Sequence, residues 1–151
     1  NVAVRQRPIN YVVEEPPIPI TPVQFGTHAR LIGYAVTQNG PTATIRLYWQ
    51  ILQPLLPPHH LFIHLDDATG QTLAQSDDVP QTVNGPAPSG SWLPGEFLVT
   101  ETQITDVALA SATASTLQLT IGLYEPATEV RLPTTANGAI TGDHVTVPLQ
   151  P

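Results

Sequence analysis

Histidines and carboxylates are the residues of this sequence that could support metal binding or acid–base chemistry. The closest separated histidine pair is His60-x-x-x-His64, and on a helix this spacing would place two metal ligands on one face. On a strand, however, four residues span about 13 Å, whereas the ligands of one zinc ion lie only about 2 Å from the metal. Pro57 and Pro58 precede the pair and apolar residues alternate through it, so we expect a strand. The sequence therefore predicts no metal site here and no cofactor.

Tandem acidic residues could suggest calcium binding or a glycosidase pair, and they occur at Glu14-Glu15, Asp66-Asp67 and Asp77-Asp78. Neighbouring residues on a strand point to opposite faces, so a tandem pair does not converge. If Asp67 opposes Gln71 across a turn, then Asp77 opposes Leu61. The two acidic regions would then lie roughly 20 Å apart, beyond the separation of glycosidase carboxylates. Calcium at the loop ends remains an alternative, and turn formation by solvated acids is the simpler interpretation.

Motifs for covalent catalysis and phosphate binding are missing from the sequence. It contains no Cys and no G-x-S-x-G segment, which removes the common nucleophile signatures. No Gly-rich loop leads into a helix pattern, so a phosphate-binding loop is not expected. We therefore predict a domain that is not an enzyme. A small hydrolase that assembles its catalytic residues from distant segments is the less favoured alternative.

Alternation of apolar and polar residues is the main structural signal. A period of two over such lengths is typical of half-buried strands. In residues 42–52 the apolar positions are Ile45, Leu47, Trp49 and Ile51, and the polar positions are Thr44, Arg46, Tyr48 and Gln50. Asn39-Gly40 comes just before and predicts a tight hairpin turn from a strand over residues 29–37.

Further strands are expected on both sides of a long loop over residues 78–95. Residues 59–67 alternate, and Asp67 and Gly70 stand at the first and fourth positions of a type I turn. The other expected strands cover residues 71–77, 97–104, 117–124, 130–132 and 145–149. No segment shows a helical period. The pattern predicts an all-β domain, a two-sheet antiparallel sandwich of the immunoglobulin-like or jelly-roll kind with about seven to nine strands.

Prolines divide the chain into two parts. Of the 17 prolines, five lie in the first 22 residues, so we expect residues 1–22 to form a proline-rich linker or N-terminal arm and residues 23–151 to form the sandwich. Residues 15–22 are expected to be extended and polyproline-like, while residues 9–14 could pair with a sheet edge. The chain has no Met, and we expect Asn1 to follow a boundary within a longer protein.

The charge balance excludes several classes of partner. The five cationic residues are all arginines, and the formal net charge is −7. Nucleic-acid binding needs clustered Lys and Arg, and so does docking on an anionic membrane surface, so we expect neither. No run of about eighteen apolar residues occurs, so direct membrane insertion of this chain is not expected.

One sheet face is a candidate binding surface, provided that the three alternating strands are neighbours in one sheet. Aromatic platforms with polar neighbours suit sugar rings or extended peptides. The outward residues of those strands are Arg46, Tyr48, Gln50, His60, Phe62, His64, Gln118, Thr120 and Tyr124. Trp92 could line a loop-end site or plug one end of the sandwich, and the N-terminal arm could instead cover the face.

Several short motifs resemble a module of known proteins: Leu47-Tyr48-Trp49-Gln50, Leu61-Phe62-Ile63-His64-Leu65-Asp66, Ser91-Trp92-Leu93-Pro94-Gly95-Glu96, Ile121-Gly122-Leu123-Tyr124 and Arg131-Leu132-Pro133. Over about residues 33–147 the chain resembles the C-terminal, extracytoplasmic β-sandwich of bacterial membrane glycosyltransferase-like proteins of the protein mannosyltransferase type. The resemblance implies an accessory domain outside the membrane, tethered through a parent protein that holds the catalytic residues. One departure is Glu129, where that module usually has Gly.

Together these observations lead to one functional expectation and one principal rival. We expect a non-catalytic accessory domain of a larger exported or membrane-bound glycosyltransferase-like protein, which contacts a glycan or cell-envelope polymer through the face described above. The rival is a structural or protein-interaction sandwich without a small-molecule ligand.

Overall fold

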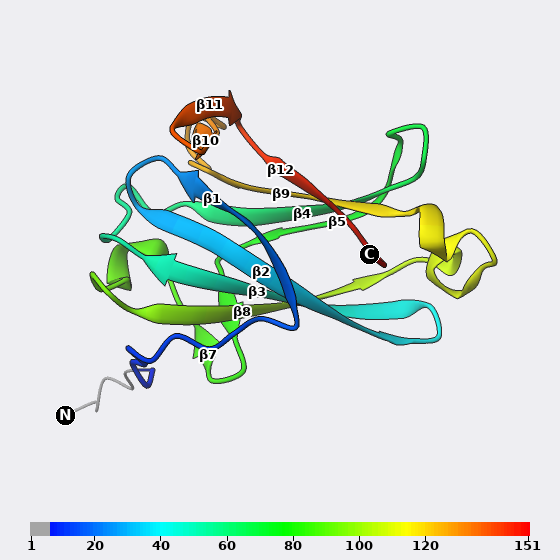
Figure 1. The fold of residues 1–151 in the computed structure, drawn as a ribbon, viewed down its shortest axis with the longest axis horizontal. Coiled ribbons are helices and arrows are strands. Elements are labelled where there is room, and N and C mark those ends of the chain that lie inside the picture. The colour runs from blue at the N-terminus through cyan, green and yellow to red at the C-terminus, as the bar shows by residue number, and fades with distance from the viewer. Residues whose placement is uncertain (1–6) are drawn as a thin grey trace.

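The computed structural model describes residues 7–151, which form two antiparallel sheets packed face to face (Figure 1). Sheet A has the order β11-β10-β1-β2-β3-β8, with β1 (Ile18–Phe25), β2 (Ala29–Asn39), β3 (Thr42–Ile51), β8 (Phe97–Thr105), β10 (Thr134–Ala136) and β11 (Ala139–Gly142). Sheet B has the order β12-β9-β4-β5, with β4 (His60–Asp66), β5 (Thr72–Asp78), β9 (Gln118–Tyr124) and β12 (Val145–Pro148). The predicted all-β sandwich is confirmed.

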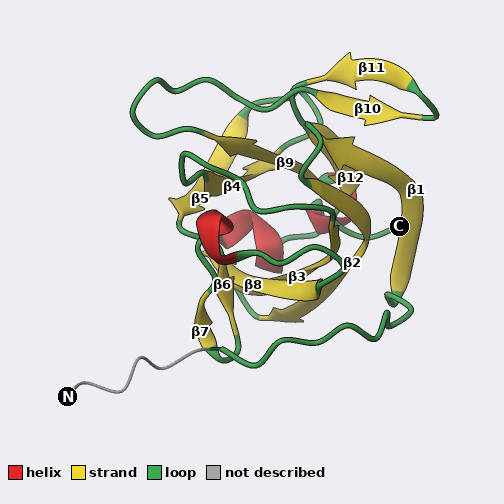
Figure 2. Ribbon diagram, turned by 90° about the vertical axis from the view of Figure 1, so that its left-hand side faces the viewer, coloured by secondary structure: helices red, strands yellow, loops and turns green. Residues whose placement is uncertain are grey.

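Short elements complete the fold between these strands. A small ribbon pairs β6 (Gln81–Thr82) with β7 (Gly85–Pro86), and three single 3-10 turns follow as η1 (Ser89–Ser91), η2 (Val107–Ala110) and η3 (Ala114–Thr116). Figure 1 shows the coiled ribbons at the two opposite ends of the sandwich, and Figure 2 looks at the sandwich from one of these ends, with one coil in front. Within residues 7–151, no helix has the length and apolar character needed to cross a membrane.

The core lies between the sheets, and the alternating strands supply it. The inward residues of β3, β4 and β9 are at most 4 % exposed: Ile45, Leu47, Trp49, Ile51, Leu61, Ile63, Leu65, Leu119, Ile121 and Leu123. Each such side chain contributes about 1.5–3 kcal/mol by leaving water. Trp49 packs edge-on against Phe25 with 5.2 Å between ring centroids, and its indole N–H donates to Thr100 Oγ1 at 3.1 Å. The period-two prediction for these segments is confirmed.

Both predicted hairpin turns are present. Asn39 pairs with Thr42 across the β2–β3 turn, and Gly40 has a φ of 59°, a conformation that glycine adopts without strain. In the β4–β5 turn the Asp67 carboxylate accepts hydrogen bonds from the Thr69 and Gln71 backbone N–H groups. A hydrogen bond from the Thr69 side chain is the largest of the effects that lower the pKa of Asp67 below its usual value.

The predicted register of the β4–β5 hairpin is wrong by one residue. The pairing shifts between Leu65↔Ala74 and Asp66↔Thr72, which leaves Leu73 as a bulge. Asp77 therefore pairs with Phe62 rather than with Leu61. Because successive strand residues alternate between faces, the bulge places Asp77 on the outer face of sheet B.

Residues 7–151 form twelve strands, more than the seven to nine expected. The strands β6, β7, β10 and β11 contain only two to four residues each, which is too short for an alternating pattern to show in the sequence. The sandwich also begins earlier than residue 23: the strand β1 starts at Ile18 and pairs with β2 in spite of Pro19 and Pro22. Prolines are tolerated in β1 where their missing N–H groups are not needed for the ladder. The six residues before Arg7 lie outside the described part of the predicted arm.

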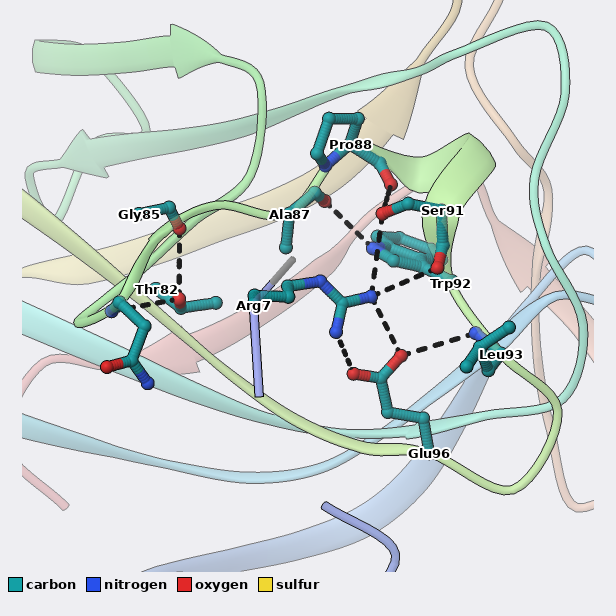
Figure 3. A network of polar contacts seen from close by, with 10 residues as sticks. Arg7, Thr82, Gly85, Ala87, Pro88, Ser91, Trp92, Leu93 and Glu96 are labelled. Atoms are coloured by element: carbon teal, nitrogen blue, oxygen red, sulfur yellow. Dashed lines mark hydrogen bonds and ion pairs between the residues drawn. The ribbon is translucent and has the colours of Figure 1, made fainter. Parts of the chain in front are cut away.

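The described arm, residues 7–17, is anchored to the sandwich by a buried ion pair (Figure 3). The Arg7 guanidinium donates to both carboxylate oxygens of Glu96, and these two side chains are only 7 % and 1 % exposed. A further guanidinium N–H donates to the Ser91 carbonyl at 3.2 Å. The Phe97 N–H donates to the Asn10 carbonyl at 2.7 Å. That single backbone bond replaces the predicted strand pairing of residues 9–14.

We expect Arg7→Ala to lower the free energy of unfolding by about 3 kcal/mol, because it leaves the buried Glu96 carboxylate without its counter-charge. The backbone N–H of Phe97 should also exchange faster with solvent once the arm loosens. Denaturant unfolding and amide hydrogen exchange measure the two effects. The double variant Arg7→Ala/Glu96→Gln should lose less stability than the single variant, since a neutral amide is easier to bury. Equal stability of wild type and Arg7→Ala would contradict the anchoring role.

Candidate functional site

The predicted binding face is wrong as a single surface, because its strands belong to different sheets. Arg46, Tyr48 and Gln50 lie on β3 in sheet A, whereas His60, Phe62 and His64 on β4, and Gln118, Thr120 and Tyr124 on β9, belong to sheet B. Since the inward residues of both sheets meet in the core, the two outward groups lie on opposite sides of the sandwich. The structure brings together only the residues of β4 and β9.

The sheet A part of the predicted face is occupied by the chain itself. Arg46 forms an ion pair with Glu101 at 2.9 Å, and the hydrogen bond to Glu101 is the largest effect that raises the pKa of Arg46. Tyr48 is 8 % exposed and pairs with Gly33, where Pro16 of the arm fills the space of a side chain. Figure 1 shows the arm passing from the β8 side of sheet A to β1. The alternative that the arm covers this face thus applies to sheet A.

Trp92 is a structural plug rather than a surface residue. Its side chain is 1 % exposed, and its indole N–H donates to the Ala87 carbonyl at 2.9 Å (Figure 3). Of the two interpretations offered by the sequence, the plug at the sandwich end is the one observed.

The outer face of sheet B is organised around Phe62. The ring lies over Gly122 on β9, where a Cβ atom would overlap it, and the two residues pair across the strands. The Arg131 guanidinium covers the ring with its carbon 4.4 Å from the centroid. His64 and Tyr124 flank it, with centroids at 5.1 and 6.2 Å. Phe62 is therefore only 3 % exposed, and it supports this face instead of offering a bare platform.

Tyr124, Asp77 and His60 form a polar group beside the Phe62 ring. The Tyr124 hydroxyl donates to Asp77 Oδ1 and lies 3.4 Å from His60 Nδ1. Burial, and then the hydrogen bond to Asp77, raise the pKa of Tyr124 to about 12. The hydroxyl therefore keeps its proton near neutral pH and can donate a hydrogen bond to Asp77 or to a ligand. It is poorly suited to act as a general base.

Tyr124 and Asp77 border a hollow of about 270 Å³, which we name the Phe62 hollow. Its lining is Phe62, Asp77, Tyr124, Glu129 and Arg131. Asp77, Glu129 and Arg131 were not among the predicted site residues. The sequence did not point to Asp77 because the β4–β5 bulge, which turns this residue to the outer face, was not predicted. It did not point to Arg131 because this residue pairs with Tyr124 through an isolated bridge and belongs to no strand. Glu129 has a φ of 61°, in the left-handed region, and the sequence pattern gave no sign that it would border this hollow.

Asp143 and Asp66 add two further carboxylates to the outer face of sheet B. Asp143 lies 3.5 Å from the Arg131 guanidinium and 2.8 Å from His144 Nδ1. The contact with His144 is the largest effect that lowers the pKa of Asp143. On β9 the Thr120 hydroxyl donates to Asp66 at 2.6 Å. Within residues 7–151, no set of three or more His, Asp or Glu side chains is arranged to hold a metal ion.

No family model, no curated protein and no solved structure matches this chain. Function is therefore inferred from the geometry of the chain's own residues. The hollow combines an aromatic wall, hydrogen-bond donors from Tyr124 and Arg131, and acceptors from Asp77 and Glu129. Such a combination can orient a small polar ligand, because apolar surfaces provide contact area and a few polar groups fix its orientation.

We expect Gly122→Ala to destabilise the protein by about 1–3 kcal/mol, because the added methyl group overlaps the Phe62 ring. In an ordinary strand the same change would be stabilising. The sign of the change in the free energy of unfolding therefore tests whether the Phe62 ring packs on Gly122. Denaturant unfolding measures it. In a Phe62→Leu background the cost of Gly122→Ala should shrink, since the smaller side chain leaves room. A neutral or stabilising effect in the wild-type background would show that the ring does not depend on Gly122.

His64 should make stability depend on pH in a defined direction. Burial is the largest effect and lowers the pKa of His64 in the folded protein, although Asp66 partly opposes it. As pH falls through about 6.5, the unfolded chain gains this proton before the folded chain does, so folding stability falls. Between about pH 7.5 and pH 5, His64→Gln should therefore lose less stability than wild type. Thermal unfolding measures this, and NMR of the imidazole reports the pKa directly; an equal loss in both proteins would contradict it.

Proposed function

We propose that this chain is a non-catalytic, carbohydrate-contacting domain whose ligand site is the Phe62 hollow on the outer face of sheet B. The observation that carries the proposal is the combination of ring, donors and acceptors around one hollow of about 270 Å³. Sugar hydroxyls are both donors and acceptors, so they pair well with carboxylates, a tyrosine hydroxyl and a guanidinium. The sugar's apolar face would lie against the Tyr124 ring and the flat guanidinium of Arg131.

The location of the hollow supports this assignment. The outer face of sheet A is crossed by the arm at Pro16, and its Arg46 is paired with Glu101. On sheet B, in contrast, the side chains of Asp77, Glu129 and Arg131 are exposed at the hollow. A ligand can therefore reach the site without displacing a structural element of the described chain.

The parent protein that we propose is an exported or membrane-bound glycosyltransferase-like protein, in which this domain lies outside the membrane. This part of the proposal is supported by the short motifs given above, which occupy β3, β4, β9, the loop leading into β8 and the segment between β9 and β10. The proposed partners are a glycan or cell-envelope polymer and the rest of the parent chain. The hydroxyl of Tyr124, which stays protonated, fits a binding role better than a catalytic one.

NMR titration with a panel of oligosaccharides, including neutral envelope-type glycans, tests the site. We expect the signals of Tyr124, His64 and Gly122 to shift with at least one glycan, with Kd values in the micromolar to millimolar range that is usual for a few polar contacts. Tyr124→Phe keeps the ring but removes one donor, and it should weaken binding by roughly tenfold. Tyr48→Phe, on the opposite side of the sandwich, is the matched control and should leave Kd unchanged.

The structural or protein-interaction alternative predicts a different result. If no glycan of the panel shifts signals on sheet B, or if shifts gather around Tyr48 and Arg46 instead, the proposed site is wrong. In the first case the alternative of a sandwich without a small-molecule ligand is favoured.

A further inference from the structure

The charges in the Phe62 hollow are not balanced within the described chain. Of the charged lining residues, Arg131 already has a counter-charge in Asp143, 3.5 Å away. Asp77 receives only the neutral O–H of Tyr124 and lies 3.7 Å from His60, which is a cation only when protonated. The Glu129 carboxylate has no hydrogen bond or ion pair among residues 7–151. At neutral pH the hollow therefore holds two carboxylates that lack a permanent cationic partner.

The same carboxylates act on the Tyr124 hydroxyl. After burial and the Asp77 hydrogen bond, the negative charges of Asp77, Glu129 and Asp78 each raise its pKa further. A potential that opposes formation of a tyrosinate is one that favours a positive charge. The carboxylates that line the hollow therefore favour a cation beside the Tyr124 ring.

Aromatic rings strengthen the same preference. The face of an aromatic ring carries negative potential and attracts cations within about 6 Å. The chain already shows such a contact at this site, where the Arg131 guanidinium carbon lies 4.4 Å from the Phe62 centroid. Next to it, the Tyr124 ring borders the hollow beside Asp77. A second cation placed there would meet one ring and two carboxylates.

We propose that the ligand of the Phe62 hollow carries a positively charged amino group, as on an amino sugar whose amine is not acetylated. The ammonium group lies between the Asp77 and Glu129 carboxylates and against the Tyr124 ring, while neighbouring sugar hydroxyls contact Arg131. This inference rests on the proposed carbohydrate-contacting function and narrows its ligand class. Neutral N-acetylated sugars and acidic sugars are predicted to bind more weakly at the same place.

Two matched glucosamine oligomers test the inference: one with acetylated amines and one with trimethylated amines, which stays cationic at any pH. In NMR titrations at neutral pH, we expect the cationic oligomer to shift Tyr124 and Gly122 with a Kd at least about tenfold lower than that of the acetylated one. Glu129→Gln should raise the Kd of the cationic oligomer by roughly three- to tenfold. It should leave the Kd of the acetylated oligomer almost unchanged.

Glu14→Gln is the control for non-specific attraction to an acidic protein. It removes the same charge from the exposed arm and should change the Kd of the cationic oligomer by less than about twofold, because exposed distant charges are screened by salt. If the acetylated oligomer binds sheet B as tightly as the cationic one, the amine inference is wrong while the carbohydrate proposal stands. If neither oligomer nor any glycan of the panel binds sheet B, both are wrong. Equal effects of Glu129→Gln and Glu14→Gln would also overturn the amine inference.

Discussion

The outer face of sheet B depends on one packing contact, that of the Phe62 ring with Gly122. Because glycine has no Cβ, the ring can lie over β9 in the space that a side chain at position 122 would occupy. In that position it supports the Arg131 guanidinium from below and flanks Tyr124. The position of the Phe62 ring therefore depends on a strand residue without a side chain, and this ring, which is almost completely buried, supports the Arg131 guanidinium at the hollow.

The sequence predicts those parts of the fold that depend on local chemistry. The strands β3, β4 and β9 follow from two-residue alternation, and the turns at Asn39-Gly40 and Asp67–Gly70 follow from residues suited to those backbone angles. The β4–β5 bulge is different, because Leu73 carries no local signal that it would be left out of the pairing. That one residue turns Asp77 to the opposite face. Asp77, which the predicted register paired with the inward-facing Leu61, thus becomes part of the candidate site.

The choice of sheet for each strand could not be predicted from alternation. The strands β3 and β4 show the same pattern of apolar and polar residues, yet β3 pairs with β2 and β8 while β4 pairs with β5 and β9. The hairpin pairings β2–β3 and β4–β5 are local and follow from their turns, but β3–β8 and β4–β9 join segments far apart in the chain, and nothing in either strand alone encodes them. The strands β4 and β9 of the predicted face are true neighbours, so the face survives only for their residues, which are His60, Phe62, His64, Gln118, Thr120 and Tyr124. Its Arg46, Tyr48 and Gln50 lie on the other side of the molecule.

The chain has few cationic residues, so some of its carboxylates have no cationic partner. Each of the four described arginines is engaged within the chain: Arg7 with Glu96, Arg30 with Gln50, Arg46 with Glu101 and Arg131 with Asp143. Since the chain has no lysine and twelve acids, the carboxylates outnumber the groups that could neutralise them. Asp77 and Glu129 are exposed at a hollow beside aromatic rings and lack a permanent cationic partner in the described chain, so a positive charge brought by a ligand would be attracted to both carboxylates.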